Sequence, residues 1–199
     1  MEALSRVGIG PEPREVRLVF LFADVCRSTE LLLGLGDHGA HRVMRAYRER
    51  TRAALAAHNG REVELRGDGV LAVFEREADA LHFALETHGL PNRIGLHAGT
   101  ALCDEGKYFG RNVVLAARLC DAARPGEVLV SESVRLSAGE IGSFSFGQPR
   151  LCALRGFESL ERAFPVTPSA LRARVSDRIA ADVSRERGLA RSVAGAAGG

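Results

Sequence analysis

The sequence predicts an α+β fold of the ferredoxin-like (split βαβ) type, with extra strands and an antiparallel sheet flanked by helices. The first observation behind this prediction is the order of the apolar patterns. Strand-like and helix-like runs follow one another as β-α-β-β-α-β, the order of a split βαβ unit. The second is the tight turn Gly67-Asp68-Gly69 between two short strand-like runs within residues 61–75, which indicates a β-hairpin. With 199 residues, 46% of them hydrophobic, the chain is long enough to bury a core.

The individual elements are predicted from local patterns. Residues 16–23 (VRLVFLFA) are β-branched and aromatic, which predicts a buried central strand. A helix capped by Ser28 or Thr29 is expected next. This helix is expected over residues 30–58, with an interruption at 34–36, and the hairpin follows it. The next elements are a helix over 78–87, a strand over 93–99, a polar excursion over 101–108 and a helix over 113–123. The last elements are a strand over 127–130, a short helix after Ser131, and edge strands over 143–146 and 161–166.

The chain is predicted to contain one folded domain. Residues 1–15 contain proline and glycine and are expected to form a leader before the first strand. The folded domain is expected over residues 16–166. Residues 167–199 hold six arginines, three acids and no aromatic residue, a composition typical of a partly helical or disordered tail.

Composition excludes several classes of function. A formal net charge of +2 gives no broad basic field, so we expect no dedicated nucleic-acid binding. No apolar run approaches the roughly 20 residues of a membrane span, and the first residues lack the apolar segment of a secretory signal. The four cysteines show no C-x-x-C spacing, which argues against a zinc site. We therefore expect a cytoplasmic, reduced protein that binds no membrane. Lys107 is the one lysine among the 27 lysine and arginine residues of the chain.

Two aspartates stand where chemistry is expected. Asp24 ends the first predicted strand and Asp68 lies at the tip of the predicted hairpin. The first and third strands of a split βαβ sheet are neighbours, so the two carboxylates can approach one another. Two hard oxygen ligands beside the backbone amides of residues 25–29 suit Mg²⁺ carrying a nucleoside triphosphate. Aspartate is also common in ordinary turns, and that reading stays open from these residues alone.

The surroundings of both aspartates resemble the catalytic domain of the class III nucleotide cyclases. The resemblance covers residues 16–166 and implies the class III cyclase fold, a nucleoside triphosphate substrate, and a homodimer with active sites at the subunit interface. The matching motifs are LFADVCRST (21–29), RGDGVLAVF (66–74), RIGLHAG (93–99), YFGRNVVLAARL (108–119), PGEVLVSESV (125–134) and LRGFE (154–158), in the expected order.

The resemblance also implies roles for individual residues. Asp24 and Asp68 would hold two Mg²⁺ or Mn²⁺ ions per active site. Arg118 would stabilise charge on the transferring phosphoryl group, for which its planar fork is suited.

Further substrate contacts are expected at positions that match the motifs of the family less directly. Thr29 would lie in the turn that cradles phosphate oxygens, Arg93 at a phosphate-facing position, and Arg155 near the triphosphate. Tyr47, midway along the long helix, could offer a ring or hydroxyl to a small base, or could simply be a half-buried helix aromatic. His97 is expected to be a packed strand histidine.

Three positions depart from the family pattern. Adenylate cyclases typically place a lysine where this chain has Glu64, and an aspartate or threonine where it has Lys107. The family also expects an asparagine at Val114, four residues before Arg118 on the same helix face. Asn112 is nearby, but it faces elsewhere on a regular helix.

The reversed pair favours UTP or CTP over GTP, with ATP the least expected substrate. Glu64 could accept from a ring N–H while Lys107 donates to a carbonyl, or the two could pair and fill the space of a purine. In this respect the chain resembles the stand-alone bacterial pyrimidine (uridylate or cytidylate) cyclases of antiphage defence, which make cyclic UMP or cyclic CMP for a separate effector. The alternatives are a guanylate cyclase and, because of Val114, a catalytically silent cyclase-homology module that binds a nucleotide or a partner.

Overall fold

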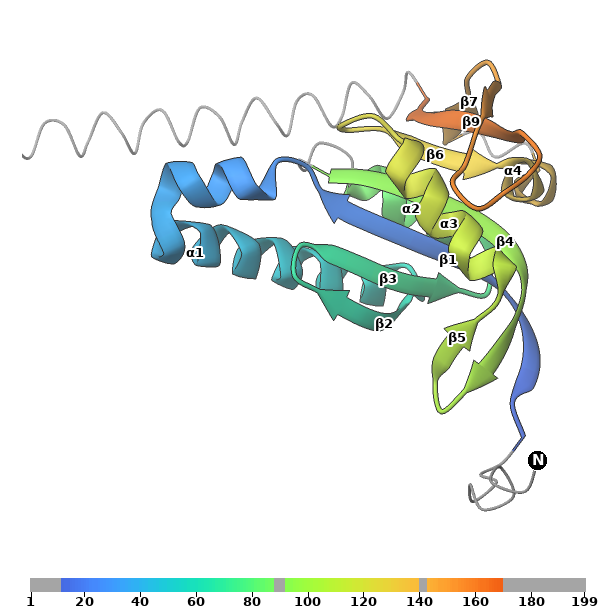
Figure 1. The fold of residues 1–199 in the computed structure, drawn as a ribbon, viewed down its shortest axis with the longest axis horizontal. Coiled ribbons are helices and arrows are strands. Elements are labelled where there is room, and N and C mark those ends of the chain that lie inside the picture. The colour runs from blue at the N-terminus through green and yellow to red at the C-terminus, as the bar shows by residue number, and fades with distance from the viewer. Residues whose placement is uncertain (1–11, 88–91, 140–142, 170–199) are drawn as a thin grey trace, which may run out of the picture.

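The computed structural model describes residues 12–87, 92–139 and 143–169, so most of the predicted leader and most of the predicted tail lie outside the described residues. Within these residues the strands form one nine-stranded sheet in the order β2-β3-β1-β4-β6-β9-β7, with β5 paired to β4 and β8 paired to β9. Helices flank this sheet (Figure 1). The predicted α+β fold is confirmed, although the pairing of β4 with β6 is parallel, which makes the sheet mixed.

The elements follow the predicted β-α-β-β-α-β order before the additional strands begin. The helices are α1 (Ser28–Ala57), α2 (Glu77–Glu86), α3 (Arg111–Ala122) and α4 (Glu132–Ala138). The strands are β1 (Arg14–Val25), β2 (Arg61–Arg66), β3 (Gly69–Phe74), β4 (Asn92–Asp104), β5 (Lys107–Phe109), β6 (Val128–Ser131), β7 (Phe144–Phe146), β8 (Arg150–Cys152) and β9 (Glu161–Pro168).

Strand β1 is the buried central strand that the sequence predicts. Its residues Val19, Phe20 and Leu21 have no exposed surface, because β3 and β4 flank it on both sides and helices cover both faces of this part of the sheet. Both neighbours run antiparallel to β1, and the register places Asp24 opposite Gly69 on β3 and opposite Arg93 on β4. The strand end that carries Asp24 is therefore held from both sides.

Helix α1 begins with an abrupt turn after β1. Arg27, the residue before the helix, has a left-handed backbone (φ 60°), which is uncommon for a residue other than glycine. The prediction that Ser28 or Thr29 caps the helix is wrong, because the helix starts at Ser28 and has no side-chain cap. The predicted interruption is confirmed: Gly36 has non-helical angles (φ 63°, ψ 173°), and α1 kinks there.

Helix α3 packs directly against β4 at two glycines. A Cβ on Gly95 would lie 2.1 Å from the backbone nitrogen of Cys120, so only glycine permits this approach. At Gly99 the side chain of Asn112 fills the corresponding space. Asn112 accepts a bond from His97 Nε2 at 3.0 Å, and burial lowers the pKa of His97, which keeps the ring neutral. His97 is thus a packed strand histidine, as expected.

Two predicted segments differ from the structure. The polar excursion over residues 101–108 is instead a hairpin, because β4 continues to Asp104 and pairs with β5 around a turn at Glu105 and Gly106, both with positive φ. The strand over residues 161–166 is not at the edge, since β9 lies between β6 and β7. Pro165 lacks an N–H, but its carbonyl accepts from the N–H of Gly147 at 2.8 Å, so the strand still bonds on that side.

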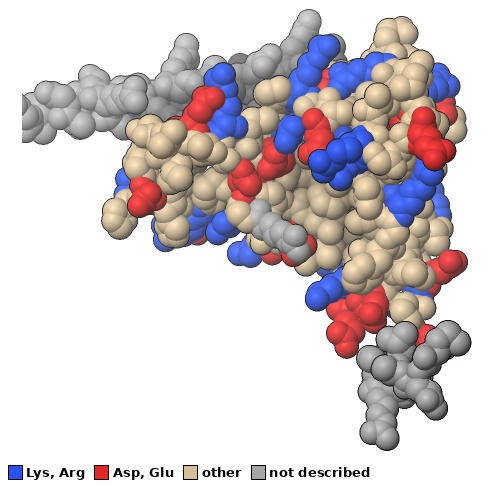
Figure 2. Space-filling view, viewed as in Figure 1, with Lys and Arg blue, Asp and Glu red and all other residues tan. Residues whose placement is uncertain are grey.

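The surface of the described residues carries mixed charge. Figure 2 shows lysine and arginine side chains interspersed with aspartate and glutamate on the viewed face. Of the helices within the described residues, none combines the length and the apolar character needed to cross a bilayer.

Candidate active site

The pairing of β1 with β3 brings Asp24 and Asp68 to the same end of the sheet. Asp68 lies in the β2–β3 turn, immediately before the residue that pairs with Asp24. The turn is fixed to β1 because the backbone N–H of Val25 donates to the Asp68 carbonyl at 3.2 Å. Both side chains line a cleft of about 390 Å³. The other lining residues are Val25, Cys26, Arg27, Ser28, Thr29, Glu30, Arg93, Ala123 and Pro125.

Each carboxylate is held by a side chain of this chain. Arg93 donates to Oδ2 of Asp24 from Nε at 3.1 Å and from Nη2 at 2.8 Å. Hydrogen bonding to Asp24 raises the pKa of the Arg93 guanidinium. The hydroxyl of Ser28 donates to Oδ2 of Asp68. Arg48 of α1 donates from Nη2 to the carbonyl of Gly67 at 2.7 Å, which holds the turn from the helix side. Neither contact was predicted, since the sequence singled out the Ser28 side chain only as a helix cap and did not single out Arg48.

The start of α1 gives this cleft the character of an anion site. Residues 25–30 line it, and Thr29 is among them. The first N–H groups of a helix have no partners within the helix, and the helix dipole places a partial positive charge there. Together with the Arg93 guanidinium, these amides suit phosphate oxygens.

Arg118 lies in the same network of charges. Its Nη1 donates to Oδ2 of Asp121 at 2.9 Å. Asp121 also contacts Arg93, whose Nη1 donates to the Asp121 main-chain oxygen at 3.0 Å. The side chains of Asp24, Arg93, Asp121 and Arg118 therefore form a continuous chain of alternating charge. Asp121 was not predicted, although its spacing of three residues from Arg118 on a helix is a signal that could have indicated it.

Glu64 lines a second and smaller pocket, of about 260 Å³, that also contains Asp24 and Asp121. Its other lining residues are Phe22, Ala23, Gly69, Val70, Leu71, Ala117 and Cys120. Burial raises the pKa of the Cys120 thiol to about 12, so the thiol stays protonated and serves packing. Glu64 and Asp24 thus share one pocket within a single chain.

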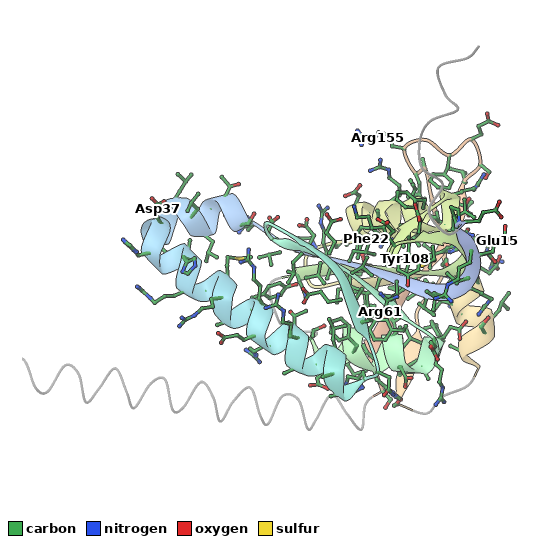
Figure 3. All side chains as sticks on the ribbon, turned by 90° about the horizontal axis from the view of Figure 1, so that it is seen from below. Glu15, Phe22, Asp37, Arg61, Tyr108 and Arg155 are labelled. Atoms are coloured by element: carbon green, nitrogen blue, oxygen red, sulfur yellow. The ribbon has the colours of Figure 1, made fainter. Side chains whose placement is uncertain are left out.

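Lys107 lies outside both clefts. It is exposed at the start of β5, and among the described residues its side chain has no hydrogen-bond or ion-pair partner. In Figure 1 the β4–β5 hairpin projects away from the end of β1 that carries Asp24. The hairpin is attached to β2 by Arg61, which donates to the hydroxyl of Tyr108 (both labelled in Figure 3). One chain therefore does not bring Lys107 to the Asp24 cleft.

Three further positions singled out in the sequence can be placed. Val114 is 44% exposed on α3, and Asn112 cannot take its place because it is bonded to His97 and to the Thr100 carbonyl. Arg155 lies in the exposed β8–β9 loop and lines neither cleft (Figure 3).

The substrate contact considered for Tyr47 is not supported. The residue is 6% exposed and packs within the hydrophobic core, and burial raises its pKa. Its ring does not line either cleft, so the structure favours the packing role.

The fold matches known structures closely. The adenylyl cyclase CyaB from P. aeruginosa superposes with a TM-score of 0.71 at 20% identity, over 80% of this chain and 97% of that chain. An adenylate/guanylate cyclase/hydrolase from Silicibacter pomeroyi gives a TM-score of 0.68 at 25% identity, over 79% of this chain and 99% of that chain. The structural neighbours are class III adenylyl and guanylyl cyclase catalytic domains, and this chain has their fold.

Sequence comparison adds a relative whose function is not named. An uncharacterized protein of Mycobacterium tuberculosis is 29% identical over 164 residues, which cover 78% of this chain and 43% of that protein. The chain therefore spans less than half the length of the first curated relatives it matches. No family model matches the chain.

Proposed function

We propose that this chain is a nucleotidyl cyclase domain, which converts a nucleoside triphosphate to the 3′,5′-cyclic nucleotide and pyrophosphate. The observation that supports this most directly is the cleft that contains Asp24, Asp68, Arg93 and the start of α1. It combines two carboxylates for divalent cations with amides and a guanidinium for phosphate. The catalytic domain would span residues 16–166, and the support for these bounds is that the strands from β1 to β9 run from Arg14 to Pro168.

The residues present fit two Mg²⁺ or Mn²⁺ ions. The donors are oxygens, which these hard cations prefer. The side-chain bonds that the described residues make to Asp24 and Asp68 go to Oδ2 in both cases, which leaves Oδ1 of each for a cation. No group of three or more histidine, cysteine, aspartate or glutamate side chains forms a metal site within the described residues, so phosphate oxygens would complete the ligand sphere. Bound ions of this kind lower the pKa of a ribose 3′-hydroxyl and neutralise triphosphate charge.

The residues of the chain would orient the substrate for an in-line displacement. The α1 amides and Arg93 would bind the triphosphate, and Arg118, which lines neither cleft within its own chain, would donate to the oxygens of the α-phosphate at the subunit interface as their charge increases. The bond between O3′ and the α-phosphorus forms while the bond from that phosphorus to the bridging oxygen breaks. Pyrophosphate leaves, and the 3′-hydroxyl proton passes to solvent.

The active form would be a homodimer with active sites at the subunit interface, in the cytoplasm. Exposed apolar side chains on β4, β5 and the start of α3 support an interface there, namely those of Leu102, Phe109 and Val114. A second chain could also supply its own Lys107 to the Asp24 cleft, since the Lys107 of one chain lies away from that cleft.

We further propose that the substrate is UTP or CTP in preference to GTP, with ATP last. The support is the reversed charge of Glu64 and Lys107 and the small size of the pocket beside Glu64. Uracil offers an N–H beside a carbonyl, to which a carboxylate and an ammonium are complementary. The product would act on a separate cyclic-nucleotide effector, with bacterial antiphage signalling as the proposed setting.

The product identifies the function directly. Purified protein is incubated with each of the four nucleoside triphosphates and Mn²⁺, and the products are identified by mass spectrometry. Cyclic UMP or cyclic CMP as the main product is the expected result. Cyclic GMP as the main product would make the chain a guanylate cyclase and contradict the pyrimidine assignment.

A catalytically silent cyclase-homology module is the second candidate, and Val114 is the observation that favours it. Loss of one hydrogen bond to the substrate typically costs on the order of 1–3 kcal/mol, which slows turnover without abolishing it. Nucleotide binding by calorimetry with no cyclic product under any condition would identify the silent module.

A further inference from the structure

The loop that carries Asp68 is bonded to helix α1 at two points. Gly67 and Asp68 form the two-residue loop between β2 and β3, and Gly67 has a positive φ of 57°. The hydroxyl of Ser28, at the start of α1, donates to Oδ2 of Asp68. Further along the same helix, Nη2 of Arg48 donates to the carbonyl oxygen of Gly67 at 2.7 Å. The beginning and the middle of α1 therefore both hold this loop.

The kink in α1 makes the second contact possible. The helix runs outward from the end of β1, changes direction at Gly36 and returns beside β2 and β3 (Figure 1). Tyr47 and Thr51 lie on the returning part of the helix and are both buried. Arg48 thus extends toward the loop from a segment that is itself fixed against the rest of the fold.

The side chain of Arg48 is partly enclosed. Its Nε is buried and has no hydrogen-bond partner among the described residues. The bond to Gly67 is the one hydrogen bond that the Arg48 side chain makes within that part of the chain. A surface arginine normally turns its Nε toward water, because an unpaired buried donor costs free energy. Arg48 therefore keeps this orientation because of what its guanidinium holds, the carbonyl of Gly67.

The position of the loop determines where the Asp68 carboxylate lies relative to Asp24. Asp24 is fixed within the sheet, between Gly69 of β3 and Arg93 of β4, whereas Asp68 lies beyond the last paired residues of the hairpin. Cations such as Mg²⁺ require their oxygen ligands at nearly fixed distances. A loop that is correctly placed for only a fraction of the time binds the cation more weakly by that same fraction. A bond that holds the loop in place thus raises the affinity for the cation.

We propose that Arg48 is a positioning residue for the metal site: through the carbonyl of Gly67 it holds the loop so that Asp68 and Asp24 face the same cations. This inference rests on the proposed function for the assignment of the two aspartates to Mg²⁺ or Mn²⁺. The positive charge of Arg48 would act in the opposite direction, because a guanidinium beside a cation site repels the cation. The sign of the change in cation affinity when Arg48 is neutralised therefore separates positioning from charge.

The test measures Mn²⁺ binding to the nucleotide-free protein, from the electron paramagnetic resonance signal of the free ion. The binding that Asp68→Asn removes is assigned to this site. Arg48→Gln is expected to weaken that binding about fivefold to tenfold. Loss of the charge alone would strengthen it. Arg48→Lys is expected to bind Mn²⁺ about threefold more tightly than Arg48→Gln, because an ammonium group can still donate one bond to a carbonyl.

Product formation gives a second readout, which a simple loss of folded protein would not imitate. For Arg48→Gln, the Mn²⁺ concentration that gives the half-maximal rate is expected to rise by the same factor as the dissociation constant. The kcat at saturating Mn²⁺ is expected to stay within about twofold of the wild type, because the bound cations then hold the loop themselves. A lower kcat at saturating Mn²⁺, with unchanged Mn²⁺ affinity, would contradict the positioning role.

The control is Arg45→Gln, which removes the same charge from α1 at an exposed position, where Arg45 pairs with Glu49 at 3.7 Å. An exposed pair of this kind contributes little, so Mn²⁺ binding is expected to stay unchanged. Unchanged or tighter Mn²⁺ binding by Arg48→Gln would overturn the inference, as would equal affinities of Arg48→Gln and Arg48→Lys, or a wild type without Mn²⁺ binding that Asp68→Asn removes. If Mn²⁺ binding changes as expected but no nucleoside triphosphate gives a cyclic product, the proposed function fails and the role of Arg48 at the metal site stands.

Discussion

Two regions of the molecule carry the residues that the cyclase resemblance singles out, and they differ in how completely one chain builds them. The triphosphate region consists of Asp24, Asp68, Arg93 and the start of α1, and its side chains are fixed by bonds to one another and to α1. The base region consists of Glu64, Lys107 and Val114. In it, Lys107 and Val114 are exposed, and Lys107 projects on a hairpin away from the Asp24 cleft.

This difference separates two requirements of the proposed reaction. Metal and phosphate binding need precise distances between charged groups, and the central strands of one sheet provide them. Base recognition needs Glu64 and Lys107 at the same base, and one chain keeps them apart, since Glu64 lines the pocket beside Asp24 and Lys107 does not. One chain therefore brings the residues of the triphosphate region together, while the base region would need the second copy of the proposed homodimer.

The largest effect on turnover is predicted for a substitution in the triphosphate region. Asp68→Asn removes one of the two proposed cation ligands and is expected to lower turnover at least about a thousandfold, or about 4 kcal/mol in transition-state stabilisation. The fold should survive, since an asparagine oxygen can still accept from Ser28. The control Asp79→Asn alters an aspartate of α2 that lines neither of the two clefts around Asp24. Turnover is measured by mass spectrometry of the product, and full activity of Asp68→Asn would refute the metal assignment.

The next effect concerns the scaffold that both regions share. Gly95→Ala places a Cβ 2.1 Å from the nitrogen of Cys120 and 2.6 Å from the carbonyl oxygen of Ala116. Backbone atoms of α3 cannot yield without moving the helix, so we expect a loss of about 3 kcal/mol in the free energy of unfolding. Gly34→Ala is the matched control, because a Cβ there meets nothing within 4 Å and alanine favours helix. Urea denaturation compares the two variants, and equal stability would contradict the packing argument.

Local patterns in the sequence were sufficient to predict the central features. The run over residues 16–23 gave β1, and the Gly67-Asp68-Gly69 turn gave the hairpin. Strand order in a split βαβ unit then predicted that Asp24 and Asp68 meet at one end of the sheet. Each of these steps depends on a short stretch of chain or on a topology with few alternatives.

Contacts between distant segments were not predictable in this way. The bond from Ser28 to Asp68 requires the left-handed backbone at Arg27, which no pattern indicated. Asp121 meets Arg93 because α3 approaches β4 at Gly95, and the sequence does not state which helix residue then faces which strand residue. Such contacts depend on packing in three dimensions.

A smaller effect tests the base region. Glu64→Lys combined with Lys107→Asp restores the charges typical of adenylate cyclases, and we expect the preference for ATP over UTP to rise at least about tenfold. In this double variant the side chain at position 64 would donate to the base through an ammonium group, and the side chain at position 107 would accept through a carboxylate. Competition assays with equal concentrations of the two nucleotides measure the ratio of cyclic products. An unchanged ratio would show that these residues do not read the base, and the triphosphate region would be unaffected by that result.

The smallest effect restores one hydrogen bond in the base region. Val114→Asn places an amide four residues before Arg118 on the same face of α3, where the family expects an asparagine that orients the ribose. We expect kcat to rise about threefold to tenfold, close to 1 kcal/mol, with little change in KM. Stability should change little, because Val114 is 44% exposed and contributes little to the core.

Val43→Asn is the matched control for this change. It makes the same replacement on a different helix, at a valine of α1 that is 40% exposed. Single-turnover rates of the two variants, measured with the same nucleotide, separate a gain in chemistry from a gain in product release. A gain that is specific to Val114→Asn would place this face of α3 against the ribose, and thus beside the reacting 3′-hydroxyl. Equal rates for both variants and the wild type would instead mean that the exposed face of α3 at Val114 does not meet the substrate, and the base region would have to be sought elsewhere on the surface.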